Sequence, residues 1–280
     1  MAAAPLATLV LAGTAESRAV IELLKSDAAF SLTASLAGAT PDPIALPVPT
    51  RMGGFGGVDG LVTYAREQGV GLLIDATHPF ARQISHNAHE AAARLGIPCL
   101  RLERQPWESE NGDDWRSFDS WQEMADAIPA GARVFLAGGT QSIEIFTKRE
   151  DIHLWARALK VEGRVGPPNT VFINAMPQSE AEERQTFLDN GITLLCCKNS
   201  GGAASFAKIA AARSLGLPVW MLKRHPHDMS QGMDQGMCRD GTGDATGKQV
   251  ANYHIHDTVE AVVAAARQVA AKTSCFASTT

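Results

Sequence analysis

The stretch LVLAGTAES, residues 9–17, decides the fold of this chain, and VFLAGGTQS, residues 134–142, repeats its pattern. In each, an apolar run typical of a buried strand leads into Leu-Ala-Gly and a turn with hydroxyl side chains. A strand that ends in small residues before a helix is how α/β proteins build an anion-binding turn, because the N–H groups of the first helical turn point at the ligand. The repeat predicts two halves, each of a size that can bind one nucleotide.

Short apolar runs alternate with segments of helical periodicity along most of the chain. Runs that are apolar on both faces indicate a parallel sheet covered by helices on each side. We therefore predict an α/β fold with two Rossmann-like parallel-sheet domains facing a cleft. The turn IPAG, residues 128–131, is the expected boundary, which gives an N-terminal domain of residues 1–129 and a C-terminal domain of residues 130–280.

The C-terminal domain is expected to carry two further features. Residues 228–249 are rich in Gly, Asp and Gln without an apolar period, which predicts a long mobile loop. After them, Asp257 is a good helix N-cap and is followed by an apolar stripe, which predicts a C-terminal helix.

Composition excludes several classes of protein. A net charge of −5 argues against a general nucleic-acid binder, whose surface would be basic. The five cysteines lack CxxC spacing, and the histidine pairs lack a third ligand, so we expect no disulfide framework, no metal site and a cytoplasmic location. No apolar run approaches the length of about 18 residues that spans a membrane, and the N-terminus reads as a strand instead of a signal peptide.

The first turn contains Gly13 and Thr14, with Glu16, Ser17 and Arg18 directly after them. It lacks GxGxxG spacing, so a plain helix cap is the alternative to a binding turn. In dinucleotide-binding folds an Asp or Glu about 20 residues later holds the ribose 2′-hydroxyl. The corresponding stretch here, TASLAGAT at residues 33–40, has no acidic residue, which favours NADP over NAD if a nicotinamide cofactor binds.

Two further motifs lie in the first half. In RMGGFGGVDG, residues 51–60, the glycine pairs would let a ligand approach the backbone and Phe55 could lie against a planar ring, although a flexible turn is the alternative. In IDATHPFARQIS, residues 74–85, a strand ends at Asp75, where α/β proteins bind ligands. Asp75 and His78 could form an acid–base pair or a structural cap.

The second half offers KNSGG, residues 198–202, at the end of a strand. Its cation, amide, hydroxyl and glycine N–H groups would converge on one crevice. Lys223 and Arg224 end the next strand and would add positive charge nearby.

These motifs resemble the precorrin-6A reductase family of cobalamin biosynthesis. The resemblance rests on LAGTAESR, RMGGFGG, DATHPFARQISHNA and KNSGG followed by AARSLGLPVWMLKR, in that order, roughly over residues 6–225. It implies an NADPH-dependent reductase that delivers hydride to a double bond of an anionic tetrapyrrole and forms precorrin-6B. It also implies channelling contacts with neighbouring enzymes of the pathway. The chain departs from the family at Arg224-His225-Pro226, where Arg-Pro is usual, and at residues 228–249.

The residues fall into three predicted groups. The cofactor is expected at Gly13, Thr14, Gly138, Gly139, Thr140, Lys198, Asn199, Ser200 and Gly201. The substrate is expected at Glu16, Ser17, Arg18, Arg51, Gly54, Phe55, Gly56, Thr77, Arg82 and Ser85. Asp75 or His78 would position the water that donates a proton after hydride addition. Three alternatives stay open: a cobalt-precorrin-6A reductase of the anaerobic route, a tetrapyrrole methyltransferase, and a non-catalytic nucleotide-binding sensor.

Overall fold

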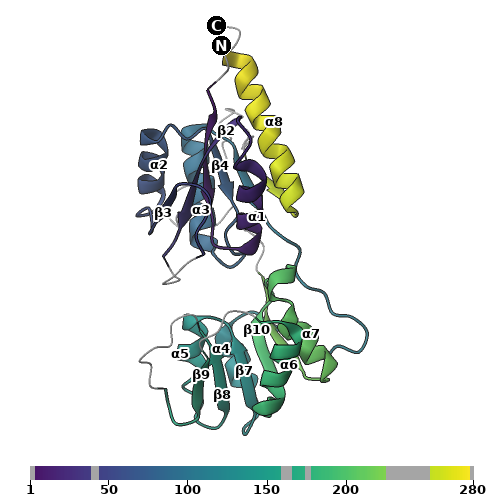
Figure 1. Ribbon diagram of the computed structural model, residues 1–280. Helices are drawn as coiled ribbons and strands as arrows, with labels where there is room; N and C mark the ends of the chain where they lie inside the picture. Colours follow the sequence, from purple (N-terminus) through teal and green to yellow (C-terminus); the bar gives the residue numbers. More distant parts are fainter. Residues whose placement is uncertain (1–3, 39–43, 159–165, 174–177, 225–252, 278–280) are drawn as a thin grey trace, which may run out of the picture. The chain divides into compact units, whose positions relative to one another are not determined.

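The computed structural model describes residues 4–38, 44–158, 166–173, 178–224 and 253–277 (Figure 1). The chain divides into two compact units, one made of Met1–Arg104 with His227–Thr280 and the other of Gln105–Pro226. The boundary predicted at residues 128–131 is therefore wrong, because the division falls in the turn-rich stretch just after residue 104. The loop predicted at residues 228–249 lies outside the described residues.

The first unit contains a six-stranded sheet in the order β12-β5-β4-β1-β2-β3, and every neighbouring pair is parallel. Counted by position, this is the 3-2-1-4-5-6 order of dinucleotide-binding folds. Its strands are β1 (Leu6–Leu11), β2 (Phe30–Leu36), β3 (Thr50–Met52), β4 (Leu72–Asp75), β5 (Cys99–Leu102) and β12 (Tyr253–His256).

Helices cover both faces of this sheet, as the doubly apolar strands predict. Side chains alternate along β1, so Val10 packs in one core with α1 and α8, whereas Leu9 and Leu11 pack in the other with α2 and α3. The predicted C-terminal helix is present, and it belongs to the first unit. The helices are α1 (Ala15–Leu24), α2 (Val58–Glu67), α3 (Arg82–Leu95) and α8 (Val259–Ala277).

The second unit contains a six-stranded sheet in the order β6-β11-β10-β7-β8-β9, again with parallel neighbours. One core holds residues of α4 and α5, and the other holds residues of α6 and α7. Its strands are β6 (Trp115–Phe118), β7 (Arg133–Ala137), β8 (His153–Arg157), β9 (Thr170–Ile173), β10 (Leu194–Lys198) and β11 (Val219–Leu222). Its helices are α4 (Trp121–Ala127), α5 (Thr140–Phe146), α6 (Glu180–Asp189), the 3-10 helix η1 (Ala203–Ser205) and α7 (Ala207–Ser214).

The two sheets have the same spatial order, so the prediction of two parallel-sheet α/β halves is confirmed. β7 lies between β10 and β8 as β1 lies between β4 and β2, which places the two quoted turns at corresponding positions. The sixth strand of each sheet is out of sequence: β6 precedes β7, and β12 follows the whole second unit. Each sheet thus takes its sixth strand from the segment that follows the fifth strand of the other sheet.

In the part of the chain that the structure describes, no helix has the length and apolar character needed to cross a membrane.

Candidate functional site

The first turn satisfies its own backbone N–H groups. Ser17 Oγ accepts hydrogen bonds from the N–H groups of Gly13 (3.1 Å) and Thr14 (3.0 Å), and Thr14 Oγ1 accepts one from Ser17 N–H (3.0 Å). The Thr14 hydroxyl also donates to the carbonyl of Ala76, just beyond β4 (2.8 Å). Ser17 has no exposed surface. Ser17 thus caps α1 with the hydroxyl that was predicted to contact substrate.

The second turn is built differently. Gly139 takes the N-cap position of α5 with φ of 88°, and among the described residues no side chain caps this helix start. The buried Ser142 corresponds to Ser17 and donates to the Gly139 carbonyl (2.7 Å). Gly138 must lack a side chain, since a Cβ there would lie 2.2 Å from Ser142 Oγ. The following residue, Thr140, is exposed and begins α5.

A cation stands beside this second turn. A Cβ at Gly139 would lie 3.8 Å from Lys198 Nζ, at the end of the neighbouring strand β10. Burial lowers the pKa of the Lys198 ammonium below its usual value, because leaving water disfavours the charged form. Gly139 and Lys198, which were both predicted as cofactor ligands, therefore lie close together in the second unit.

The two residues after Lys198 brace the protein. Asn199 Oδ1 accepts from the backbone N–H of Trp107 (2.8 Å), and its Nδ2 donates to the Trp107 carbonyl (2.9 Å). The buried Ser200 hydroxyl donates to the Lys198 carbonyl (3.4 Å), and Arg224 Nη2 donates to the Ser200 carbonyl (2.8 Å). A Cβ at Gly201 would lie 2.0 Å from the carbonyl oxygen of Gln105. These residues shape the turn, where the prediction made them cofactor ligands.

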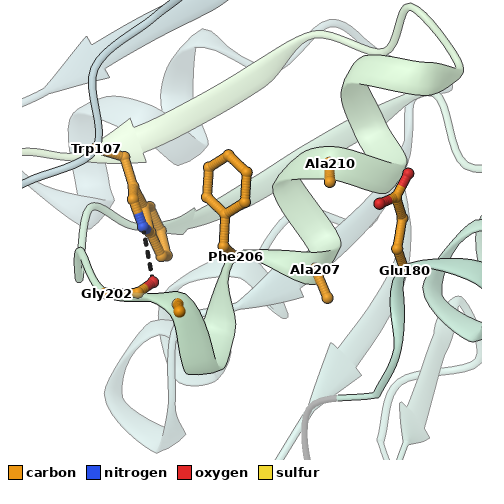
Figure 2. A pocket seen from close by; sticks show the side chains of 7 residues that line it. Trp107, Glu180, Gly202, Phe206, Ala207 and Ala210 are labelled. Carbon is orange, nitrogen blue, oxygen red and sulfur yellow. Dashed lines mark hydrogen bonds between the residues drawn. The ribbon is translucent and has the colours of Figure 1, made fainter. Parts of the chain in front are cut away.

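Trp107 borders a hollow of about 420 Å³ next to this turn (Figure 2). Its indole N–H donates to the Gly202 carbonyl (3.0 Å), and its ring meets Phe206 edge-on with centroids 5.8 Å apart. The hollow is lined by Trp107, Glu180, Gly202, Ala203, Phe206, Ala207 and Ala210.

In the first unit, Asp75 is enclosed and has no exposed surface. Its Oδ1 accepts from Thr77 N–H (3.1 Å) and from the Thr77 hydroxyl (2.7 Å), and it forms an ion pair with Arg101 Nη1 (2.8 Å). Ser85 is also buried, with its Oγ 3.4 Å from Thr77 Oγ1. Asp75 is therefore not placed to exchange a proton at an open site, and Thr77 and Ser85 use their hydroxyls inside the protein, contrary to the prediction.

His78 lies half-buried directly after this network. Its Nδ1 accepts a hydrogen bond from the backbone N–H of Phe80 (3.2 Å). An accepting Nδ1 carries no proton, so the neutral ring carries its proton on Nε2. In that tautomer His78 can donate a hydrogen bond through Nε2.

Arg51 holds together the glycine-rich loop that follows it. Its guanidinium donates to Ser35 Oγ (2.9 Å) and to the carbonyls of Gly53 (2.8 Å) and Gly54 (3.0 Å). It also lies 3.8 Å above the Phe55 ring. Arg51 and Phe55 therefore stack on each other, where the prediction placed them against substrate. The loop continues into Gly56, which adopts a positive φ of 80°.

Two predicted cations of the first unit remain available. Arg18 lies in the first turns of α1 and Arg82 begins α3, and neither side chain has a hydrogen-bond or ion-pair partner among the described residues. Both helices begin beyond the carboxyl ends of neighbouring strands, β1 and β4. The predicted Glu16 instead forms an ion pair with Arg104.

The described residues contain no group of three or more His, Cys, Asp or Glu side chains that could hold a metal ion.

A family model described as "Precorrin-6x reductase CbiJ/CobK" matches residues 7–239 and so spans most of both units. The chain belongs to the precorrin-6x reductase family. The predicted resemblance is thereby confirmed, and membership of a reductase family decides against a methyltransferase or a sensor.

Individual relatives of the chain support this family assignment. The precorrin-6A reductase of Rhodobacter capsulatus is 42% identical over 77% of this chain and 87% of its own length. That of a Sinorhizobium species is 40% identical over 77% and 84%. The cobalt-precorrin-6A reductase of Priestia megaterium is 29% identical over 77% and 89%. A solved structure titled "CobK precorrin-6A reductase" is 36% identical, with a TM-score of 0.81 over 94% of this chain and 97% of that one.

Three residues that were not predicted contact residues that were, two of them in the first unit and one in the second. Arg101 pairs with Asp75, Trp107 is held by Asn199, and Arg104 pairs with Glu16. Arg101 and Arg104 belong to RLER, at residues 101–104, whose two cations at the end of an apolar run were a usable signal. Trp107 lies in a turn-rich stretch that contains no such signal.

Proposed function

We propose that this chain reduces precorrin-6A to precorrin-6B in cobalamin biosynthesis by hydride transfer from NADPH. The observation that carries the proposal is the family match, which spans residues 7–239. The metal-free substrate is favoured because the relatives named precorrin-6A reductase are more similar to this chain than two relatives named for the cobalt-containing substrate, which are 29% and 26% identical.

The second turn supports binding of the cofactor phosphates. Gly139 has exposed backbone beside the Lys198 ammonium, whereas Ser17 already occupies the N–H groups of the first turn. A phosphate between Gly139 and Lys198 would favour the charged form of a cation that burial disfavours. We therefore assign the pyrophosphate to the second unit.

The strand ends support NADPH over NADH. β2 ends at Leu36 and β8, its counterpart, ends at Arg157, so neither strand ends in the carboxylate that typically holds a ribose 2′-hydroxyl. Arg157 donates two hydrogen bonds to Glu183, which keeps the nearby carboxylate occupied. Among the described residues, the two strand ends therefore present no free carboxylate to a 2′-phosphate.

The first unit supports binding of the anionic tetrapyrrole. An acidic protein that binds carboxylates must concentrate positive charge locally. Arg18 and Arg82 supply such charge at the carboxyl edge of the first sheet, and the Arg51 brace fixes the glycine-rich loop at the same edge. His78 can donate a hydrogen bond from Nε2 within that region.

NADPH supplies the hydride, so the protein mainly has to orient the reactants and exclude competing reactions. The chain contributes Lys198 and the Gly139 turn to hold phosphate, Arg18 and Arg82 to hold carboxylates, and His78 to donate a hydrogen bond. The proton that completes the reduction comes from water in this scheme, since Asp75 is enclosed.

The test is an anaerobic assay of the purified chain with precorrin-6A and either NADPH or NADH. We expect NADPH absorbance to fall as mass spectrometry detects a product with two more hydrogen atoms. Because a charge-assisted hydrogen bond to the 2′-phosphate contributes about 1.5–3 kcal/mol, kcat/KM should be roughly ten- to a hundredfold higher with NADPH than with NADH. No turnover would refute the activity, and equal values would refute the cofactor choice.

A further inference from the structure

Arg101 connects the ends of two neighbouring strands inside the first unit. It faces Asp75 in the register of β5 against β4, and neither side chain has exposed surface. Arg101 Nη1 lies 2.8 Å from Asp75 Oδ1, 3.1 Å from Thr77 Oγ1 and 3.4 Å from the Thr77 carbonyl oxygen. A single guanidinium nitrogen therefore contacts both the last residue of β4 and the turn beyond it.

The hydrogen bonds of this network have a fixed direction. The carboxylate of Asp75 can only accept, so the Thr77 hydroxyl donates to it (2.7 Å) and accepts from Arg101. The Thr77 N–H also donates to Asp75 Oδ1 (3.1 Å). Between them, the carbonyl of Ala76 accepts from Thr14 Oγ1 (2.8 Å). The turn is thus bound to residues at the ends of β1, β4 and β5.

Stability alone does not account for this buried ion pair. Within the described protein, Asp75 Oδ2 and Arg101 Nε and Nη2 have no hydrogen-bond partner. Glu103 Oε2 lies 4.0 Å from Arg101 Nε. Two apolar side chains of similar volume often replace a buried ion pair without loss of stability. The pair adds what apolar residues cannot supply, which is the orientation of the turn.

We propose that Arg101 is a positioning residue that fixes the turn from Thr77 to Pro79 and the start of α3. His78 follows Thr77 directly, and Arg82 is the first residue of α3. Arg101 thereby sets where the His78 donor and the Arg82 cation stand relative to the bound tetrapyrrole. This inference rests on the proposed function for its kinetic part, whereas its structural part can be measured without substrate.

The main variant is Arg101→Lys in the full chain. It keeps the buried charge, but the lysine side chain is one bond shorter than the path to Arg101 Nη1, so its ammonium cannot take the Nη1 position between Asp75 and Thr77. We expect kcat/KM for precorrin-6A to fall about tenfold or more, with KM for NADPH unchanged. Amide hydrogen exchange should become about tenfold faster at Thr77 and His78 and stay unchanged in β1. The control, Arg94→Lys, alters an exposed pair with Asp59 and should change neither measurement.

A double variant, Asp75→Val with Arg101→Met, separates positioning from stability. It also tests whether Arg101 positions the turn if Arg101→Lys does not fold. We expect it to melt close to the wild-type temperature while kcat/KM for precorrin-6A stays at least about tenfold lower and exchange at the turn stays fast. Wild-type kinetics and exchange in either folded variant would overturn the proposal. If the wild-type chain did not reduce precorrin-6A at all, the proposed function would fall, and the exchange comparison would still decide whether Arg101 positions the turn.

Discussion

Replacing Lys198 by Met should weaken cofactor binding without destabilising the protein. The Lys198 side chain ends beside the Gly139 turn. Methionine has an uncharged side chain of similar length, so the substitution removes the charge and keeps an apolar chain in its place. One charge-assisted hydrogen bond to phosphate contributes about 1.5–3 kcal/mol, so NADP⁺ should bind roughly ten- to a hundredfold more weakly.

Removing one partner of an ion pair usually lowers the free energy of unfolding, and we do not expect Lys198→Met to lower it. Burial lowers the Lys198 pKa in the folded protein below its usual 10.5. Below the folded pKa the ammonium is charged in both states, so its desolvation cost is fully present there, and it fades as pH rises from the folded pKa toward 10.5. Removing the charge removes that cost, so the ligand-free variant should melt no lower than the wild type.

Isothermal titration with NADP⁺ across a series of pH values, together with thermal melting, measures both effects. Wild-type affinity should fall with rising pH before the usual lysine pKa is reached, because bound phosphate favours the charged ammonium, and Lys198→Met should lack this dependence. Lys25→Met is the control, since Lys25 is an exposed residue of the first unit and pairs with Glu22. Wild-type affinity in Lys198→Met, or a melting temperature more than about 2 °C below the wild type, would refute the reasoning.

Two other substitutions test the site and the turn that shapes it. Arg82→Ala should raise KM for precorrin-6A about tenfold, or roughly 1.4 kcal/mol, and leave NADPH binding unchanged. The control, Arg94→Ala at the other end of α3, should leave both kcat and KM unchanged. Loss of NADPH binding in Arg82→Ala would contradict the assignment of Arg82 to the substrate. Gly201→Ala should lower the melting temperature far more than Gly216→Ala, because both positions have positive φ but only at Gly201 would the Cβ meet a backbone oxygen, 2.0 Å away. The strain at Gly216 should cost about 1–3 kcal/mol, and equal shifts in the two variants would contradict the steric argument.

The sequence predicts the sheets well because their central strands are apolar on both faces and end in small residues. β1 and β7 are examples, and their shared pattern correctly places the two turns. The domain boundary was missed because the two exchanged strands, Trp115–Phe118 and Tyr253–His256, are short, half-exposed edge strands with polar residues. Such segments have little periodicity, and pairing with a distant part of the chain defines them.

The candidate site was predicted less completely for a different physical reason. Residues that bind a ligand and residues that brace a turn are of the same types, so sequence does not show that Ser17 and Asn199 satisfy neighbouring backbone groups. Their roles depend on where backbone groups lie after folding, as with Asn199 and Trp107, 92 positions apart. Gly139 and Lys198 were found together because the carboxyl ends of neighbouring parallel strands meet at one edge.

The exchange of sixth strands determines the order in which a ribosome can complete the molecule. When residue 104 emerges, the first sheet lacks β12, and the face that α1 shares with α8 lacks Val262, Val263 and Ala266 of α8. The second sheet receives all six of its strands by Leu222, well before β12 is synthesised. The nascent chain must therefore carry an unfinished apolar face through the synthesis of an entire second unit, and the half that is begun first is finished last.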